Sequence, residues 1–397
     1  MDDLSIRGLA KSICDASDLI EKQEIFRWNK DKLSNCRILL FDQDLTNFPT
    51  DWCNQKFGKY SLYGLSDYSK MFILDKNVVD NQANLVAVSR CVNFDLNISS
   101  YLRKYYYAYN SFEEDGFKEL LLYLKEKQFQ TTIQAYLLER GYNNIDRLDE
   151  KATMEIILSD IMFEKSTVED LKQKKVIRPI LNMEDNMLAK ERFDLLLNIN
   201  RTESFNKPSN YLMIYCLLLK AYLLKYDQKL YGINKVDCLI GFALDCLNCY
   251  SERELVMCAL YLRNDNNALP FFRKMQPNVK NIVKEIKNMT WDILHIRLME
   301  SEMAIRNQGG NLTYLHYFVS RDDRFMNILK TNQVKSFIMI DGKSFIICEK
   351  NIFDICQNEL LLTKIRNEGQ QRYYNCQNIN YKIISEKLEQ EIKQLNY

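Results

Sequence analysis

The stretch Arg37-Ile38-Leu39-Leu40-Phe41-Asp42 decides the fold, because it is a short apolar run that ends abruptly at an acid. A strand that is buried on both faces has this pattern, and such strands are typical of parallel sheets covered by helices. Before it, apolar residues recur at helical spacing from Ile6 to Ile20 and predict an amphipathic helix. We therefore expect an α/β fold, with a small mostly parallel sheet flanked by helices.

Further along the chain, the apolar pattern predicts more strands and long helical stretches. Glu155-Ile156-Ile157-Leu158-Ser159 reads as a second strand, and Ser166-Thr167-Val168-Glu169 after it has the spacing of a capping box that starts a helix. Residues 101–142 and 210–287 have helical patterns. Near the C-terminus, two apolar runs flank Asp341-Gly342, which predicts a hairpin.

These patterns divide the chain into core segments and large α-helical insertions. In chain order we expect an N-terminal helix and first strand at 1–60, a helical insertion at 61–150, a second strand and helix at 151–175, a further helical insertion at 176–285, the C-terminal part of the core at 286–360, and a helical tail at 361–397.

Composition excludes several classes of protein. Glycine and proline make up about 4% of the chain, against roughly 12% in average usage, so glycine-rich phosphate loops and flexible linkers are poor fits. With two histidines, most imidazole metal sites and catalytic triads lack candidates, and carboxylates are the favoured chemical groups. The net charge of +1 means that a polyanion must be met by a local basic patch.

The sequence also predicts a compartment. Twelve cysteines are scattered along a long chain that begins Met1-Asp2-Asp3, without a basic and apolar leader. The longest apolar stretch, Tyr211 to Leu224, contains Lys220 and is too short to cross a bilayer. We expect a cytoplasmic protein with no membrane segment, and an oligomer is compatible with the sequence.

Acids stand where strands end or helices begin, and these are the candidate chemical groups. Asp42 and Asp44 follow the first strand, and Asp322 and Asp323 follow the apolar run that ends at Ser320. Asp292 lies near the start of a helix, with His295 three residues on. Carboxylates that meet at the carboxyl edge of a sheet would stay ionised only around a cation, and oxygen ligands suit Mg²⁺ or Mn²⁺.

Each acid also has a structural interpretation. Asp42 and Asp44 are typical turn residues, Asp292 suits the positive end of a helix dipole, and Asp322 could cap the helix that follows it. His295 is more often a hydrogen-bonded helix histidine than a base.

Three segments together resemble the PIN-domain ribonucleases. Ile38-Leu39-Leu40-Phe41-Asp42-Gln43-Asp44 resembles the family's first acidic motif, and Tyr317-Phe318-Val319-Ser320-Arg321-Asp322 its last, with Asp44 in place of the usual Asn and Ser320 in place of Thr. Between them, Thr290-Trp291-Asp292-Ile293-Leu294-His295 resembles the helix that carries the third acid. The family's remaining acid matches Glu164, with Glu169 as the competitor.

The resemblance implies a metal-dependent endoribonuclease. Asp42, Glu164, Asp292 and Asp322 would hold Mg²⁺ or Mn²⁺ to activate water against an RNA phosphodiester, with Asp323 as a further ligand. It is compatible with a toxin- or defence-type activity restrained by an inhibitory protein partner. Two alternatives stay open: a single-stranded DNA nuclease that uses the same site, and a non-catalytic PIN-like interaction protein.

Overall fold

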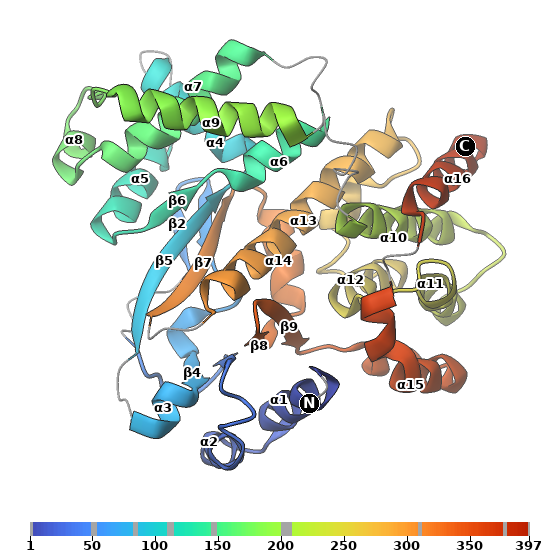
Figure 1. Cartoon of the computed structure of the whole chain (residues 1–397). Helices are drawn as coiled ribbons and strands as arrows, with labels where there is room; N and C mark the ends of the chain where they lie inside the picture. The colour runs from blue at the N-terminus through green and yellow to red at the C-terminus, as the bar shows by residue number, and fades with distance from the viewer. Residues whose placement is uncertain are drawn as a thin grey trace. The chain divides into compact units, whose positions relative to one another are not determined.

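The computed structural model in Figure 1 covers the whole chain and describes residues 3–48, 54–81, 86–108, 115–143, 149–199, 209–308, 312–375 and 379–395. The chain forms two compact units. Unit 1 comprises Met1–Asn206, His295–Arg321 and Lys335–Ile346, and unit 2 comprises Lys207–Leu294, Asp322–Val334 and Ile347–Tyr397. The long helix α13 (Ile282–Arg306) contributes its first half to unit 2 and its second half to unit 1.

The first predicted strand, β1 (Cys36–Leu40), is buried along its whole length, as its apolar pattern predicts. In the described part of the chain it belongs to a four-stranded sheet of order β4-β1-β8-β9, with β4 at Phe72–Asp75, β8 at Val334–Ile340 and β9 at Lys343–Cys348. However, β1 pairs antiparallel with both β4 and β8, so the expectation that it lies in a parallel sheet is wrong. An apolar run indicates burial on two faces, but not the direction of the neighbouring strands.

The predicted hairpin is present between β8 and β9. Asp341 and Gly342 form its two-residue turn with φ of 47° and 72°. Positive φ at both central residues is the geometry that matches the twist of the strands, and Asp-Gly adopts it readily.

Parallel pairing occurs in a second sheet, which is mixed. Among the described residues its order is β2-β3-β7-β5-β6, with β2 at Gln55–Phe57, β3 at Tyr60–Tyr63, β7 at Leu312–Ser320, β5 at Ala87–Phe94 and β6 at Gln130–Thr132. Strand β5 is parallel to β6 and β7, whereas β3 is antiparallel to β7. The chain is thus mixed α/β with two small sheets, and one mostly parallel sheet is not what the structure has.

Segment 61–150, expected to be a helical insertion, provides β4 of the first sheet and β5, β6 and most of β3 of the second. The segment also contains helices, as predicted. Strands β5 and β6 are parallel and therefore need a crossover connection, which includes α4 (Leu96–Tyr107) and α5 (Phe117–Glu126). The other helices up to residue 165 in the described ranges are α1 (Asp3–Asp15), α2 (Leu19–Trp28), the 3-10 turn η1 (Tyr68–Lys70), α3 (Lys76–Asn81), α6 (Gln134–Asn143) and α7 (Glu150–Lys165).

The second predicted strand, Glu155 to Ser159, is wrong, because these residues lie within α7. Ile156 and Ile157 are buried in the helix, and a short buried apolar run reads alike in a helix and a strand. The capping box begins one residue later than predicted, with Thr167 and Asp170 at the start of α8 (Val168–Lys172). It is followed by α9 (Met183–Ile199), which packs against α7.

Unit 2 is helical apart from the ends of β8 and β9, which agrees with the predicted helical patterns. Tyr211 to Leu224 lies within α10, whose inward side chains form a core with α12 and α16. In the residues that the structure describes, no helix has the length and apolar character needed to cross a membrane. Besides the first half of α13, the described helices and 3-10 turns of unit 2 are α10 (Ser209–Tyr226), α11 (Ile233–Asp245), α12 (Glu252–Leu262), η4 (Phe271–Lys274), α14 (Asp323–Thr331), η5 (Ile352–Asp354), α15 (Glu359–Asn375) and α16 (Tyr381–Gln394).

Candidate functional site

Asp42 lies two residues after the end of β1, one of the two inner strands of the four-stranded sheet. Its φ of 57° is left-handed, an uncommon conformation for a residue other than glycine. The side chain is 87% exposed, and its Oδ1 lies 3.7 Å from Lys70 Nζ. Because β1 is antiparallel to both neighbours, Asp42 does not stand at the carboxyl edge of a parallel sheet, where ligands are expected. Asp44 is also exposed.

Glu164 lies near the C-terminal end of α7, on the side of the helix that faces two cations. Its Oε1 is 3.9 Å from Arg192 Nη2, and the main-chain oxygen of Glu164 accepts a hydrogen bond from Lys125 Nζ at 2.8 Å. Partial burial raises the pKa of the Glu164 carboxyl, while Arg192 and Lys125 oppose this effect. Its competitor Glu169 is in the first turn of α8.

The other acids belong to unit 2. Asp322 caps α14, since its Oδ1 accepts hydrogen bonds from the amides of Arg324 at 3.0 Å and Phe325 at 3.3 Å. Its Oδ2 also lies 3.4 Å from Lys274 Nζ. Asp323 is exposed in the first turn of the same helix, and Asp292 is half-buried on α13. The capping interpretation of Asp322 is thereby confirmed.

Within the ranges that the structure describes, no group of three or more histidine, cysteine, aspartate or glutamate residues is placed to hold a metal ion. The metal site remains a prediction from the sequence.

His295 pairs with an acid that sequence reasoning missed. Its Nε2 lies 3.3 Å from Glu139 Oε2 on α6. Nearby, Asp95 directly follows β5 and caps α4, accepting a 2.7 Å hydrogen bond from the amide of Ile98. Burial raises the pKa of Asp95 to about 6, against the opposing effects of that hydrogen bond and of His295. His295 thus links α13 to α6.

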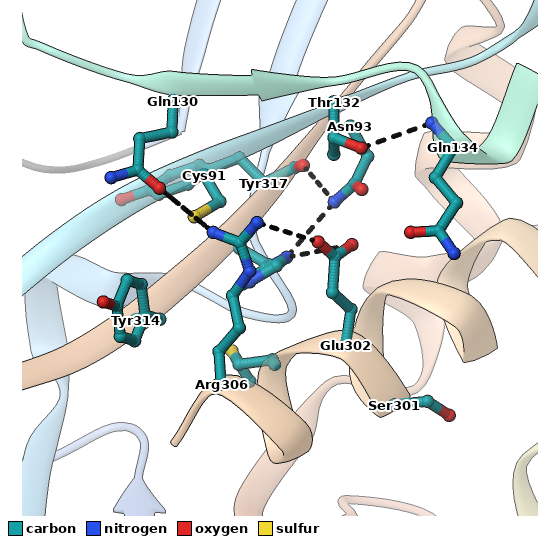
Figure 2. Close-up of polar contacts among 12 residues, drawn as sticks. Cys91, Asn93, Gln130, Thr132, Gln134, Ser301, Glu302, Arg306, Tyr314 and Tyr317 are labelled. Atoms are coloured by element: carbon teal, nitrogen blue, oxygen red, sulfur yellow. Dashed lines mark hydrogen bonds and ion pairs between the residues drawn. The ribbon is translucent and has the colours of Figure 1, made fainter. Parts of the chain in front are cut away.

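A polar row crosses the three parallel strands of the mixed sheet. Gln130 on β6 is in register with Cys91 on β5, which is in register with His316 on β7. Registered residues of parallel strands point to the same face, so this row forms a polar stripe where a sheet is usually apolar. The second half of α13 packs its side chains Glu302 and Arg306 onto this stripe (Figure 2).

Arg306 and Glu302 bind the stripe through several contacts, as Figure 2 shows. Arg306 Nη1 donates to Gln130 Oε1 at 3.0 Å and lies 3.1 Å from Cys91 Sγ. Its Nη2 is 3.3 Å from Glu302 Oε1, one helical turn before it. On the other side, Glu302 Oε2 lies 3.8 Å from His316 Nδ1. This network is therefore continuous from the edge strand β6 to β7.

His316 is neutral in this network. It has no solvent exposure, and burial, reinforced by Arg306, lowers its pKa to about 3. Asn93 Nδ2 lies 3.4 Å from its Nδ1. Because His316 carries no charge at neutral pH, the charge of Glu302 is balanced by Arg306 alone within the network of Figure 2. Burial raises the pKa of Glu302, and Arg306 lowers it.

Arg306 reaches an open pocket of about 660 Å³ at the edge of β6. One part of its wall is polar or charged, formed by Lys125, Gln130, Thr131, Thr132, Gln134, Glu164, Arg192 and Arg306. The rest is apolar, formed by Phe129, Ile133, Leu137, Phe163 and Leu195. Three cations and one carboxylate thus line the same pocket, which makes it basic and lets it receive a ligand with both anionic and apolar parts.

Arg192 is held in place by a buried carboxylate behind the pocket wall. Its Nη1 lies 2.7 Å from Asp160 Oδ2, and Asp160 Oδ1 accepts a hydrogen bond from Thr131 Oγ1 at 3.3 Å. Burial and the nearby Glu164 raise the pKa of Asp160 to about 6, against the effect of Arg192. The guanidinium therefore has a fixed position at the pocket, although its side chain is 25% exposed.

Sequence reasoning identified Glu164 but not the cations around it. The one local signal was the Glu302-Arg306 spacing, since residues four apart share a helix face. Lys125, Arg192 and Gln130 come from separate elements, and no local pattern joins them. Comparison of the chain with family models, curated proteins and solved structures gives no match.

Proposed function

We propose that the chain binds RNA, with a nucleotide of the RNA in the pocket beside β6. The observation that carries this proposal is the lining of that pocket, which combines the cations Lys125, Arg192 and Arg306 with an apolar wall. Cations bind phosphates, and apolar and aromatic surfaces accept bases, so a nucleotide matches both parts of the wall. A local basic site of this kind is what a chain with a net charge of +1 requires.

One of the cations, Lys125, is suited to phosphate binding. Lys125 Nζ donates one hydrogen bond to the Glu164 carbonyl, and an ammonium group has three donors. Partial burial lowers its pKa, against the effects of Glu164 and Asp160. An anion in the pocket would therefore interact with Lys125 in partly desolvated surroundings, where charge–charge interactions are stronger than in water.

Cleavage of the bound RNA is the further part of the proposal. The segments around Asp42, Asp292 and Asp322 support a metal-dependent endoribonuclease through their resemblance to the PIN-domain ribonucleases, and Glu164 lines the pocket. In such an enzyme the ion would activate water for attack on the phosphodiester. A toxin- or defence-type activity, restrained by a protein partner, is the biological setting that this resemblance favours.

Binding is tested first, by fluorescence anisotropy with labelled single-stranded RNA and DNA. Lys125→Glu is expected to weaken RNA binding about tenfold or more, because it replaces an attractive charge by a repulsive one in a partly buried pocket. Lys11→Glu, which makes the same charge change at an exposed position of α1, is the matched control. Equal effects of the two variants, or RNA affinity unchanged by Lys125→Glu, would exclude the pocket as the RNA site.

Cleavage is tested separately with the same RNA in Mn²⁺, Mg²⁺ or chelator, beside Asp42→Asn and Asp322→Asn. We expect the original chain to cleave RNA only when Mn²⁺ or Mg²⁺ is present, and we expect both variants to lose this cleavage. Binding in the pocket without any cleavage would leave an RNA-binding protein and exclude the nuclease. Cleavage of DNA alone would support the single-stranded DNA alternative.

We also propose a cytoplasmic location. Among the described residues, buried cysteines with free thiols are Cys36, Cys91, Cys216, Cys258 and Cys356. Free thiols are typical of a reducing compartment. Fractionation of cells that express the chain would test this location.

A further inference from the structure

We infer that Arg306 is a phosphate-contacting side chain of the pocket and that Glu302 is a positioning residue that holds the Arg306 guanidinium toward it. This inference rests on the proposed RNA binding and deepens it, because it assigns the contact made from α13. Neither Arg306 nor Glu302 belongs to the segments that resemble the PIN-domain ribonucleases.

The contacts of Arg306 fix the plane of its guanidinium. Two strands hold Nη1, through Gln130 Oε1 at 3.0 Å and Cys91 Sγ at 3.1 Å, and its own helix holds Nη2 through Glu302. The side chain nevertheless remains 35% exposed and lines the pocket. A guanidinium has five donors in a rigid fork, so donors are left for an anion. A side chain that is already ordered loses less conformational entropy when a ligand binds.

On its other side, Glu302 lies near a neutral histidine. Its Oε2 is 3.8 Å from Nδ1 of the fully buried His316, and Asn93 Nδ2 on β5 lies 3.4 Å from the same nitrogen. Within this network Arg306 is therefore the charged partner of Glu302, and the carboxylate holds the guanidinium beside β5 and β6. Since Glu302 is not among the residues that line the pocket, its effect on a bound anion passes through Arg306.

Two roles for Glu302 make opposite predictions. If the carboxylate acted only as a negative charge near the pocket, any substitution that removes the charge would tighten RNA binding. If it positions Arg306, then Glu302→Ala weakens binding although a negative charge is lost, and Glu302→Gln restores it. The amide oxygen of Gln can still accept a hydrogen bond from Arg306, whereas Ala cannot.

The experiment measures RNA affinity of the full chain as a function of salt concentration. We expect Arg306→Ala to weaken binding about tenfold and to lower the salt slope by about one. Arg306→Lys is expected to recover only part of the affinity, because Lys lacks the fork that contacts Gln130 and Glu302 together. Glu302→Ala should weaken binding about threefold to tenfold, and Glu302→Gln should stay within about twofold of the original chain.

Controls separate the outcomes. Glu24→Ala removes an exposed glutamate from α2 and should leave affinity unchanged, and circular dichroism should show each variant folded. The inference is overturned if Lys125→Glu weakens RNA binding but Arg306→Ala binds RNA as tightly as the original chain. It is also overturned if Glu302→Ala binds RNA more tightly than the original chain. If Lys125→Glu also has no effect, the proposed RNA site itself has failed.

Discussion

Arg37 and Asp75 form a buried ion pair between the two strands β1 and β4, with Arg37 Nε 2.9 Å from Asp75 Oδ2 and side chains that are 6% and 8% exposed. The same guanidinium donates through Nη1 to Asn307 Oδ1 and to the carbonyl of Leu312, each at 3.0 Å. Asp75 also accepts a 2.9 Å hydrogen bond from the amide of Val78 at the start of α3. One side-chain pair thus connects the antiparallel sheet to the end of α13 and the start of β7.

Because both partners are buried, removal of one leaves an unpaired charge in the interior. Asp75→Ala is expected to lower the free energy of unfolding by about 3–5 kcal/mol, as measured by urea denaturation. The exposed pair of Lys30 and Asp80, 2.7 Å apart, is the control, and Asp80→Ala should change stability far less. Equal losses in the two variants would contradict the role given to the buried pair.

The burial of β1 could be predicted from its sequence, whereas its neighbours could not. The four consecutive apolar residues Ile38 to Phe41 indicate that both faces are covered, but β4 and β8 come from other parts of the chain. The Asp341-Gly342 hairpin was predictable because its turn depends on two adjacent residues. By contrast, Ile156 and Ile157 occupy a buried helix face that has the same local pattern as a buried strand.

The candidate pocket was predictable only in part, for a similar reason. Glu164 was selected from the sequence and lines the pocket. Arg306, however, contacts Gln130 and Cys91 across 176 and 215 residues of chain. These contacts depend on the register of β5 and β6, which is a property of the folded sheet. Side chains that meet through strand register carry no periodic signal.

Gly116 provides a test of a close backbone contact. Its φ is +85°, and a Cβ at this position would overlap the carbonyl of Phe57 at the end of β2. Gly116→Ala is therefore expected to destabilise the chain by about 2 kcal/mol or more, because strain and a steric clash combine. Gly8→Ala is the control, since a Cβ there meets no atom within 4 Å among the described residues and improves helix propensity by about 1 kcal/mol. Thermal unfolding of both variants measures the contrast, and destabilisation by both would argue against the contact.

Asp322 can be tested as a helix cap and as a nuclease residue with one pair of variants. Asn caps helices about as well as Asp, so Asp322→Asn should leave stability nearly unchanged, while Asp322→Ala should cost about 1 kcal/mol. If the carboxylate also takes part in cleavage, Asp322→Asn loses activity while the fold is retained. Activity that survives in Asp322→Asn would assign this residue to capping alone.

RNA binding should depend on pH because carboxylates adjoin the cations of the pocket. Burial raises the pKa of Glu164. As pH falls, protonation of this group removes negative charge from the pocket wall, and RNA affinity should rise by about twofold to fivefold. Glu164→Gln should bind more tightly at pH 7.5 and show a flatter profile. An unchanged profile in that variant would assign the pH dependence to other groups.

The raised pKa of Asp160 predicts that its contribution to stability decreases as pH rises, whereas that of an ordinary salt-bridged carboxylate increases. Its pKa rises from 3.8 to about 6 on folding, so the folded chain binds more protons than the unfolded chain between these values. The contribution to stability is therefore present below about pH 4 and is lost as pH rises through about 6. Asp160→Asn keeps one oxygen acceptor, which can serve Arg192, but it cannot titrate. Relative to this variant, the original chain should lose about 1–3 kcal/mol between pH 4 and 7 in urea unfolding. The exposed Asp31→Asn serves as the control, and a difference that stays constant with pH would show that Asp160 is ionised throughout.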